Sequence, residues 1–137
     1  MLLSALFAIA LTAAAGTAGF KVVVHKDNPA RGLPKSKIAL MFTKMTSQWE
    51  GGAAVEPVDQ MATSFARAAF SLAIHGRDVD AIKSAWQRAV FAGHGEPPLE
   101  KASDEEVIAF VASHAGGIGS VSNTAVTDKV KALDILN

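Results

Sequence analysis

Hydrophobic and polar positions between residues 20 and 58 predict a strand, a helix and a second strand. Residues 20–25 (FKVVVH) hold three consecutive valines and lead into the turn-prone segment KDNP, which is typical of a buried strand. Residues 34–42 (PKSKIALMF) carry apolar side chains at helical spacing and begin with proline, which favours a helix. After the glycine turn at 49–52 (WEGG), residues 54–58 predict a short strand containing Pro57. Because proline cannot donate to a β-ladder, we expect this strand to be an edge or terminating element.

Three further helices are expected along residues 63–117. Thr63 or Ser64 can cap the first, which ends near residues 75–76 and has apolar positions at Phe65, Ala69, Leu72 and Ala73. Asp78 can cap the second, which carries a stripe of Ile82, Ala85, Trp86, Ala89 and Val90. Residues 103–106 (SDEE) form a capping box that begins the third helix, and residues 116–117 (GG) end it.

The remaining apolar runs, 118–122 and 130–135, predict strands that finish the chain. Strands that alternate with helices indicate an α/β fold, with a small mixed sheet flanked by helices. The chain has 137 residues and neither an internal repeat nor a low-complexity linker. We therefore expect a single domain over residues 19–137.

The first twenty residues contain no charged side chain, and their apolar run MLLSALFAIAL is followed by small residues. This pattern is typical of a secretory signal peptide, although no basic residue precedes the apolar run. We expect residues 1–18 to be a cleaved signal peptide, which places the mature protein in the periplasm or outside the cell. A retained anchor and a buried N-terminal helix are the alternatives.

Composition excludes several classes of protein. The 13 basic and 13 acidic side chains cancel, which argues against a nucleic-acid partner because such proteins need a field of one sign. The absence of cysteine excludes disulfides, thiolate zinc sites and thiol nucleophiles. The neutrality conceals an asymmetry, because residues 21–77 sum to +4 and residues 78–137 to −4. The first half could therefore favour an anion.

No pattern of residues supports catalysis, a metal site or a cofactor. The four histidines at positions 25, 75, 94 and 114 lack the close spacing of metal ligands. The chain contains no nucleophile elbow, Walker loop or dinucleotide fingerprint. We therefore expect a protein that is not an enzyme and that carries neither metal nor cofactor.

The most informative segment is 55–70 (VEPVDQMATSFARAAF), where a strand leads into a helix that begins at Thr63 or Ser64. Unpaired N–H groups at a helix N-terminus can hold an oxyanion. The Ser64 hydroxyl and the Arg67 guanidinium could add to such a site. In the alternative interpretation, Thr63 or Ser64 is only a helix cap and Arg67 only a surface residue.

A series of short motifs runs in order through residues 20–135. It comprises 21–29 (KVVVHKDNP), a helix at 33–42 followed by Lys44, Trp49 before a glycine turn, Pro57-Val58, Ser64-x-x-Arg67-x-x-Phe70, Trp86 with Phe91-x-Gly93, Pro97-Pro98, Ser103-x-x-Glu106-Val107, and 116–119 (GGIG). This series resembles the small, single-domain members of the phosphate ABC transporter substrate-binding family, within the periplasmic binding protein-like superfamily. The resemblance implies one lobe of a type II periplasmic binding protein, with phosphate held at the helix N-terminus at Ser64. The oxyanion site expected here comprises Thr63, Ser64 and Arg67.

Two functions follow as hypotheses. In the first, the protein is an exported substrate-binding-like protein that binds phosphate or a related oxyanion for transport. In the second, it is an envelope interaction or sensory module that kept the lobe but lost the ligand, and the Trp49 turn or the loop 93–98 meets an envelope or transporter protein. An Arg67 held in an internal ion pair beside an exposed apolar patch would favour the second hypothesis. A positive notch at Ser64 that is open to solvent would favour the first.

Overall fold

The computed structural model describes residues 19–137, so the expected signal peptide at 1–18 lies outside the described residues. The strands are β1 (Lys21–Val24), β2 (Gly32–Pro34), β3 (Glu56–Gln60), β4 (Leu99–Lys101), β5 (Gly117–Val121) and β6 (Lys131–Leu136). The helices are α1 (Lys35–Phe42), α2 (Phe65–Phe70), α3 (Val79–Phe91) and α4 (Asp104–Ser113), and the π-helical turn η1 (Ser71–His75) continues α2. None of the helices within residues 19–137 has the length and apolar character needed to cross a membrane.

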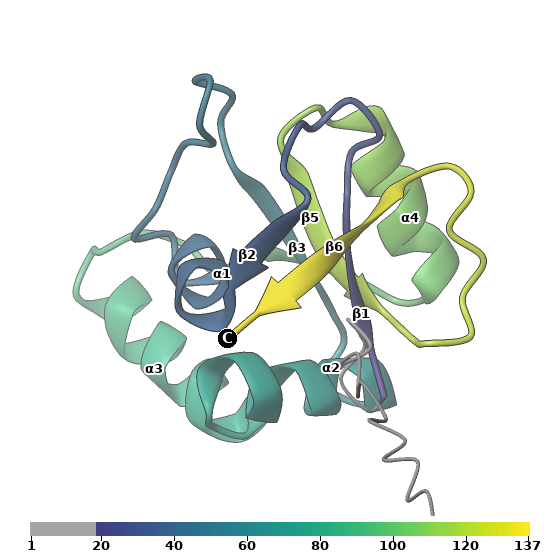
Figure 1. Ribbon diagram of the computed structural model, residues 1–137. Helices are drawn as coiled ribbons and strands as arrows, with labels where there is room; N and C mark the ends of the chain where they lie inside the picture. Colours follow the sequence, from purple (N-terminus) through teal and green to yellow (C-terminus); the bar gives the residue numbers. More distant parts are fainter. Residues whose placement is uncertain (1–18) are drawn as a thin grey trace, which may run out of the picture.

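The strands form one six-stranded mixed sheet in the order β2-β6-β1-β5-β3-β4. β1 runs antiparallel to both β5 and β6. β3 runs parallel to both β5 and β4, and β2 runs parallel to β6. This arrangement confirms the predicted α/β class with a small mixed sheet flanked by helices (Figure 1).

Helices cover both faces of the sheet, and β1 shows how the sequence divides the core. Val22 and Val24 point to the face covered by α1, α2 and η1, where they join a cluster that includes Phe42 and Phe70. Val23 points to the opposite face, in the cluster that contains Val107 and the other buried side chains of α4. Because side chains alternate along a strand, three consecutive valines fill both layers.

The prediction that the strand containing Pro57 lies at an edge is wrong. β3 lies inside the sheet, with β5 on one side and the short strand β4 on the other. Pro57 pairs with Ile118 of β5, whereas β4 pairs with β3 only from Val58 onward. The proline is tolerated because the ladder with β4 begins one residue after it.

The predicted apolar positions of the helix at 63–75 are correct only in part, because Ala69 and Ala73 pack against the core and the other two do not. Phe65 and Leu72 are exposed, whereas Ala66, Phe70 and Ile74 are buried against the sheet. Both sets of residues are apolar at helical spacing, so the sequence offers two competing stripes. Packing selects the stripe that contains Phe70, whose ring lies 5.6 Å from that of Phe20 and 4.7 Å from that of Phe42.

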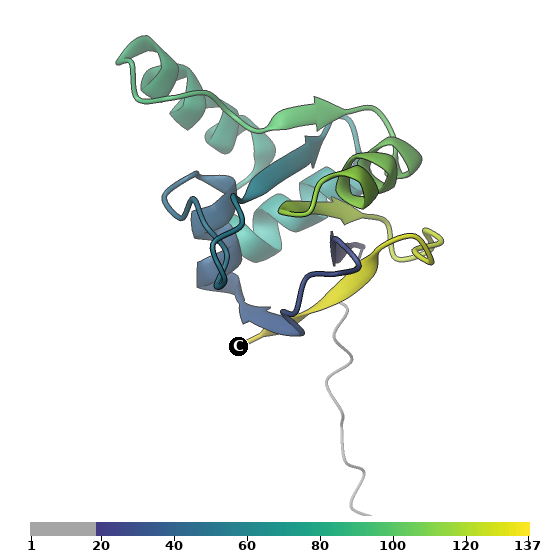
Figure 2. The same ribbon diagram turned by 90° about the horizontal axis from the view of Figure 1, so that it is seen from above.

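Helix α3 packs mainly against η1, and its second half extends away from the sheet (Figure 2). Val79 and Ile82 near its start are buried, whereas Trp86 is half-buried and Val90 is exposed. The expected core stripe of this helix is therefore correct only at its beginning. Beyond Ile82 the apolar side chains border hollows on the surface.

Candidate functional site

The junction between β3 and α2 places Ser64 at the start of the helix. Of the two predicted caps, Ser64 takes the position, and its Oγ accepts a hydrogen bond from the Arg67 N–H at 3.2 Å. The same hydroxyl donates to Oε1 of Gln60 at 2.8 Å. Thr63 lies exposed immediately before the cap. Ser64 therefore caps α2, and Thr63 precedes the cap.

The guanidinium of Arg67 lies on the inner side of α2. Its side chain is only 5% exposed, and its Nη2 forms an ion pair with Oδ2 of Asp59 at 3.5 Å. Its Nη1 donates to the backbone oxygen of Gln60 at 2.6 Å. Arg67 therefore links α2 to β3 on the buried side of the helix, whereas the Ser64 hydroxyl lies at the start of the helix.

Asp59 is a buried carboxylate with incomplete hydrogen bonding. Burial raises its pKa to about 6, against the opposing effect of the Arg67 charge. Its Oδ1 has no hydrogen-bond partner within residues 19–137. A buried acceptor without a partner is costly, so Asp59 is a point where the fold is under electrostatic strain.

A second carboxylate, Asp104, adjoins the start of α2 through Gln60. Its Oδ1 accepts from Nε2 of Gln60 at 2.6 Å and from the Ser122 N–H at 3.0 Å. Its Oδ2 accepts from the Ser122 hydroxyl at 2.5 Å. Burial raises the pKa of Asp104, but the hydrogen bonds from Ser122 and Gln60, together with the charge of Lys21, outweigh it and hold the pKa below its ordinary value. Asp104 is therefore ionised at neutral pH and forms a resident anion in this region.

The hydrogen-bond network Ser64–Gln60–Asp104–Ser122 was not visible in the sequence. Gln60 and Asp104 are 44 residues apart in the sequence. An acidic residue at position 104 is already explained by the capping box at the start of the helix, so nothing in the sequence links it to Gln60. The available signal is weak: Gln60 ends β3 and Ser122 follows β5, and these two strands are parallel neighbours in the sheet.

The other residues singled out from the sequence serve the fold. Trp49 is buried, and its indole Nε1 donates to the backbone oxygen of Gly116 at 2.9 Å. His75 packs edge-on against Phe70, and burial together with Arg67 and Arg77 lowers its pKa to about 4. His114 stacks on Phe110 with ring centroids 3.9 Å apart. Nowhere in residues 19–137 do three or more metal-ligating side chains converge.

No known protein-family profile matches the chain, and neither does any curated protein sequence. Solved structures do match. A protein described as a phosphate ABC transporter substrate-binding protein with bound phosphate, from Clostridium perfringens, is 22% identical with a TM-score of 0.67. An ABC-type phosphate transport receptor from Vibrio cholerae is 19% identical with a TM-score of 0.68. PstS from Borrelia burgdorferi is 9% identical with a TM-score of 0.58.

Each match covers 85% of this chain but only 44% of the Clostridium protein, 46% of the Vibrio protein and 47% of the Borrelia protein. The chain thus spans less than half the length of these structural relatives. The similarity supports the family resemblance predicted from the motifs at the level of the fold. The chain has the fold of one lobe of a phosphate ABC transporter substrate-binding protein.

Proposed function

We propose that this protein is a substrate-binding-like protein that binds phosphate or a related oxyanion weakly at the start of α2, and that it catalyses no reaction. The observation that carries the proposal is the geometry of the first turn. The N–H of Ala68 donates to the backbone oxygen of Ser64 and makes the first main-chain hydrogen bond of α2. The N–H group of Phe65, an exposed residue, precedes it and is available to an anion beside the hydroxyls of Thr63 and Ser64. The phosphate bound by the Clostridium protein supports this choice of ligand.

Arg67 has a different part in the proposed site from Thr63 and Ser64. The hydroxyls and main-chain N–H groups would contact the anion. Arg67, held by Asp59 and by the backbone of Gln60, would fix the position of the first turn and add positive charge from beneath. In this proposal Arg67 is a positioning residue.

The resident carboxylate of Asp104 opposes the binding of an anion, so we expect a low affinity. Replacement by asparagine removes the charge and keeps the oxygen that accepts from Nε2 of Gln60 and from the Ser122 N–H, while the Ser122 hydroxyl then accepts from the new NH₂ group instead of donating. In Asp104→Asn the affinity for phosphate should increase several-fold relative to the wild type, because like charges repel across this short network. Isothermal titration calorimetry with phosphate and with sulfate measures the change.

Asp134→Asn, on the exposed side of β6, serves as a matched control that removes an equal charge elsewhere and should leave the affinity unchanged. Thr63→Ala should weaken binding without removing the helix cap. If neither the wild type nor Asp104→Asn releases or absorbs heat with either anion at millimolar concentration, oxyanion binding is excluded.

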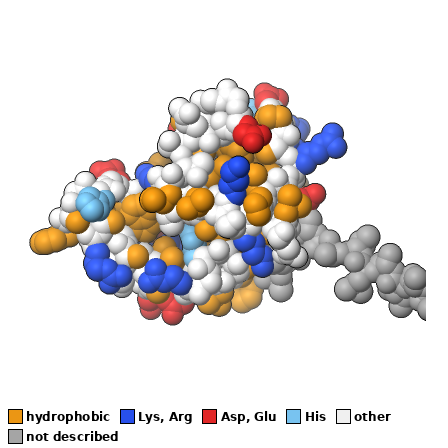
Figure 3. Space-filling view, turned by 60° about the vertical axis from the view of Figure 1, so that its left-hand side comes forward, with side chains coloured by type: hydrophobic (Ala, Val, Ile, Leu, Met, Phe, Trp, Pro, Cys, Tyr) orange, Lys and Arg blue, Asp and Glu red, His pale blue; other side chains and the backbone are white. Residues whose placement is uncertain are grey.

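A second function, partner recognition, is favoured by the internal ion pair of Arg67 and by apolar side chains left in contact with solvent. Phe91 is 96% exposed at the end of α3, and Val90 beside it is 48% exposed. Figure 3 shows hydrophobic side chains on this side of the molecule, interspersed with lysines and arginines. A photo-crosslinking residue at Phe91 in the native host should give a discrete product if a partner docks here, whereas one at exposed Val126 should not. Equal crosslinking at both positions would exclude a specific partner.

The proposed role also requires export. We propose that residues 1–18 act as a cleaved signal peptide and that the mature protein is periplasmic or secreted. Mass spectrometry of the protein expressed in a bacterial host identifies the first residue. An intact Met1 in the soluble fraction would exclude cleavage, and retention in the membrane fraction would favour an anchor.

A further inference from the structure

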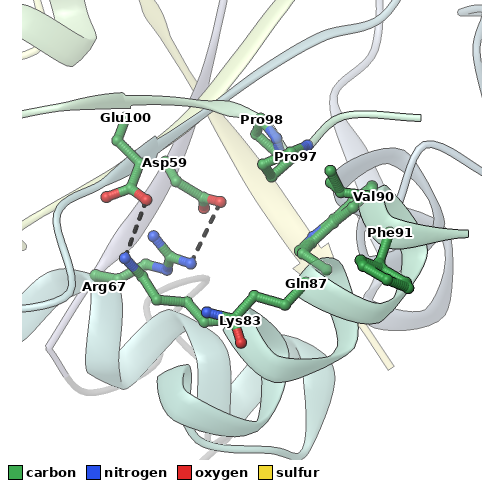
Figure 4. A pocket seen from close by; sticks show the side chains of 10 residues that line it. Asp59, Arg67, Lys83, Gln87, Val90, Phe91, Pro97, Pro98 and Glu100 are labelled. Carbon is green, nitrogen blue, oxygen red and sulfur yellow. Dashed lines mark ion pairs between the residues drawn. The ribbon is translucent and has the colours of Figure 1, made fainter. Parts of the chain in front are cut away.

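A pocket separate from the start of α2 lies between α3 and the neighbouring segments of β3 and β4. Its volume is about 350 Å³, which is within the range of small-molecule sites. Its lining includes Trp86, Gln87 and Val90 from α3, with Pro97 and Pro98 opposite. Figure 4 shows Gln87 and Val90 on the helix and Pro97 and Pro98 on the chain that leads into β4.

The pocket is divided into a charged end and an apolar end. At the charged end Arg67 pairs with Asp59 at 3.5 Å, and Lys83 pairs with Glu100 at 3.2 Å. The two ion pairs lie side by side in Figure 4, with the prolines and Val90 at the other end. Apolar walls with a few polar groups at one end are typical of sites that orient a small organic ligand.

Hydrogen bonding at the charged end is incomplete on the acceptor side. The Arg67 side chain donates to the backbone of Gln60 and also faces Asp59. Lys83 faces Glu100. In contrast, Oδ1 of Asp59 is buried without a partner within residues 19–137, and Asp59 lines the pocket. Oδ1 is closed to solvent, so a donor group reaches it once the carboxyl turns toward the pocket, and an anion gains no partner at this oxygen.

We propose that this pocket binds a small apolar molecule that ends in a protonated amine, with the amine donating to Oδ1 of Asp59 and the apolar body lying against Trp86, Val90 and Pro97. An amine gives a charge-assisted hydrogen bond, which is stronger than the bond from a neutral hydroxyl. The half-buried indole of Trp86 adds an aromatic surface that favours both the apolar body and a nearby cation. This site shares the Arg67–Asp59 ion pair with the proposed oxyanion site, but it uses the carboxylate of Asp59, whereas the oxyanion site uses the first turn of α2.

Three probes of matched size test the proposal on the whole protein, namely phenethylamine, phenethyl alcohol and hydrocinnamate. Heteronuclear NMR follows the indole N–H signals of Trp86, in the pocket, and of Trp49, which is buried in the core. Phenethylamine should shift the Trp86 signal in a saturable manner and leave the Trp49 signal unchanged. Phenethyl alcohol should bind several-fold more weakly, and hydrocinnamate should not bind. The proposal is overturned if hydrocinnamate binds as tightly as the amine, or if no probe shifts Trp86.

Two variants test whether amine binding depends on the residues that line the pocket. Asp59→Asn should weaken phenethylamine binding about tenfold and change the binding of the alcohol little. Val90→Lys places a cation at the wall of the pocket, on an exposed part of the helix where the fold tolerates it, and should abolish amine binding. Val126→Lys makes the same substitution at an exposed position outside the pocket and should bind like the wild type. Unchanged amine binding in Val90→Lys overturns the proposal even if Asp59→Asn does not fold.

Discussion

Replacing Arg67 with methionine is expected to lower the free energy of unfolding by about 3–5 kcal/mol at neutral pH. The guanidinium is the cation that faces the buried Asp59 carboxylate, and it also donates to the backbone of Gln60. Its removal leaves a buried charge without compensation and a buried carbonyl without that donor. Methionine matches much of the volume of arginine, so the loss reports on charge and hydrogen bonding more than on a cavity.

The loss should depend on pH, with a sign fixed by Asp59. Its pKa is about 6 in the folded protein, compared with an ordinary value of 3.8. Between these values the folded state holds more protons than the unfolded state, so the stability from this group decreases as pH rises through the window. Without Arg67, the pKa of Asp59 rises further because the charge that lowers it is gone. The variant should therefore lose more stability at pH 8 than at pH 5.

Urea denaturation of both proteins at pH 5 and pH 8 measures this difference. Burial, Arg67 and Arg77 lower the pKa of His75 to about 4, and its effect on stability has the opposite sign. Removal of Arg67 relaxes this shift in the variant, which also makes the loss smaller at pH 5 than at pH 8. Arg88→Met on the exposed side of α3 is the matched control and should change stability little. The double variant Asp59→Leu with Arg67→Met should recover much of the loss, because it leaves no buried charge. An equal loss at both pH values would contradict this assignment.

Sequence reasoning succeeded where the determinants are local. The valine strand before residue 25 and the helix that starts after Ser103 are both present. Ser103 accepts from the Glu106 N–H at 3.2 Å, and Glu106 accepts from the Ala102 N–H at 2.7 Å. These contacts lie within four residues of one another, so the pattern alone contains the information.

The errors arose where distant segments decide the outcome. Whether Pro57 lies at an edge depends on β4, which is far away in the sequence. Which stripe of α2 becomes buried depends on the aromatic side chains that meet it across the core. In the same way, Ser64 and Arg67 were found from a local pattern, but their partners Gln60, Asp104 and Asp59 emerge only once the strands are assembled.

Gly116→Ala is expected to be the other strongly destabilising change, at about 3–5 kcal/mol, the sum of a steric clash and weakened buried hydrogen bonds. A Cβ at Gly116 would overlap the backbone carbonyl oxygen of Ala54, where the two chains cross closely. The Gly116 oxygen also accepts from the Glu56 N–H and from Nε1 of Trp49, both at 2.9 Å. Separation of the chains to admit a methyl group must stretch both bonds at the start of β3.

Urea denaturation gives the loss of stability, and tryptophan fluorescence should move to longer wavelength as the Trp49 ring gains access to water. Gly51→Ala is an instructive control. Gly51 has a φ of +98° but open space around its Cβ position, so alanine there costs only backbone strain of about 1 kcal/mol. If Gly116→Ala costs no more than Gly51→Ala, the close approach of Ala54 is not what requires glycine. If Gly116→Ala costs more than Gly51→Ala and shifts the Trp49 fluorescence, glycine is required at position 116 because the segment around Trp49 and Ala54 packs closely against the start of β5.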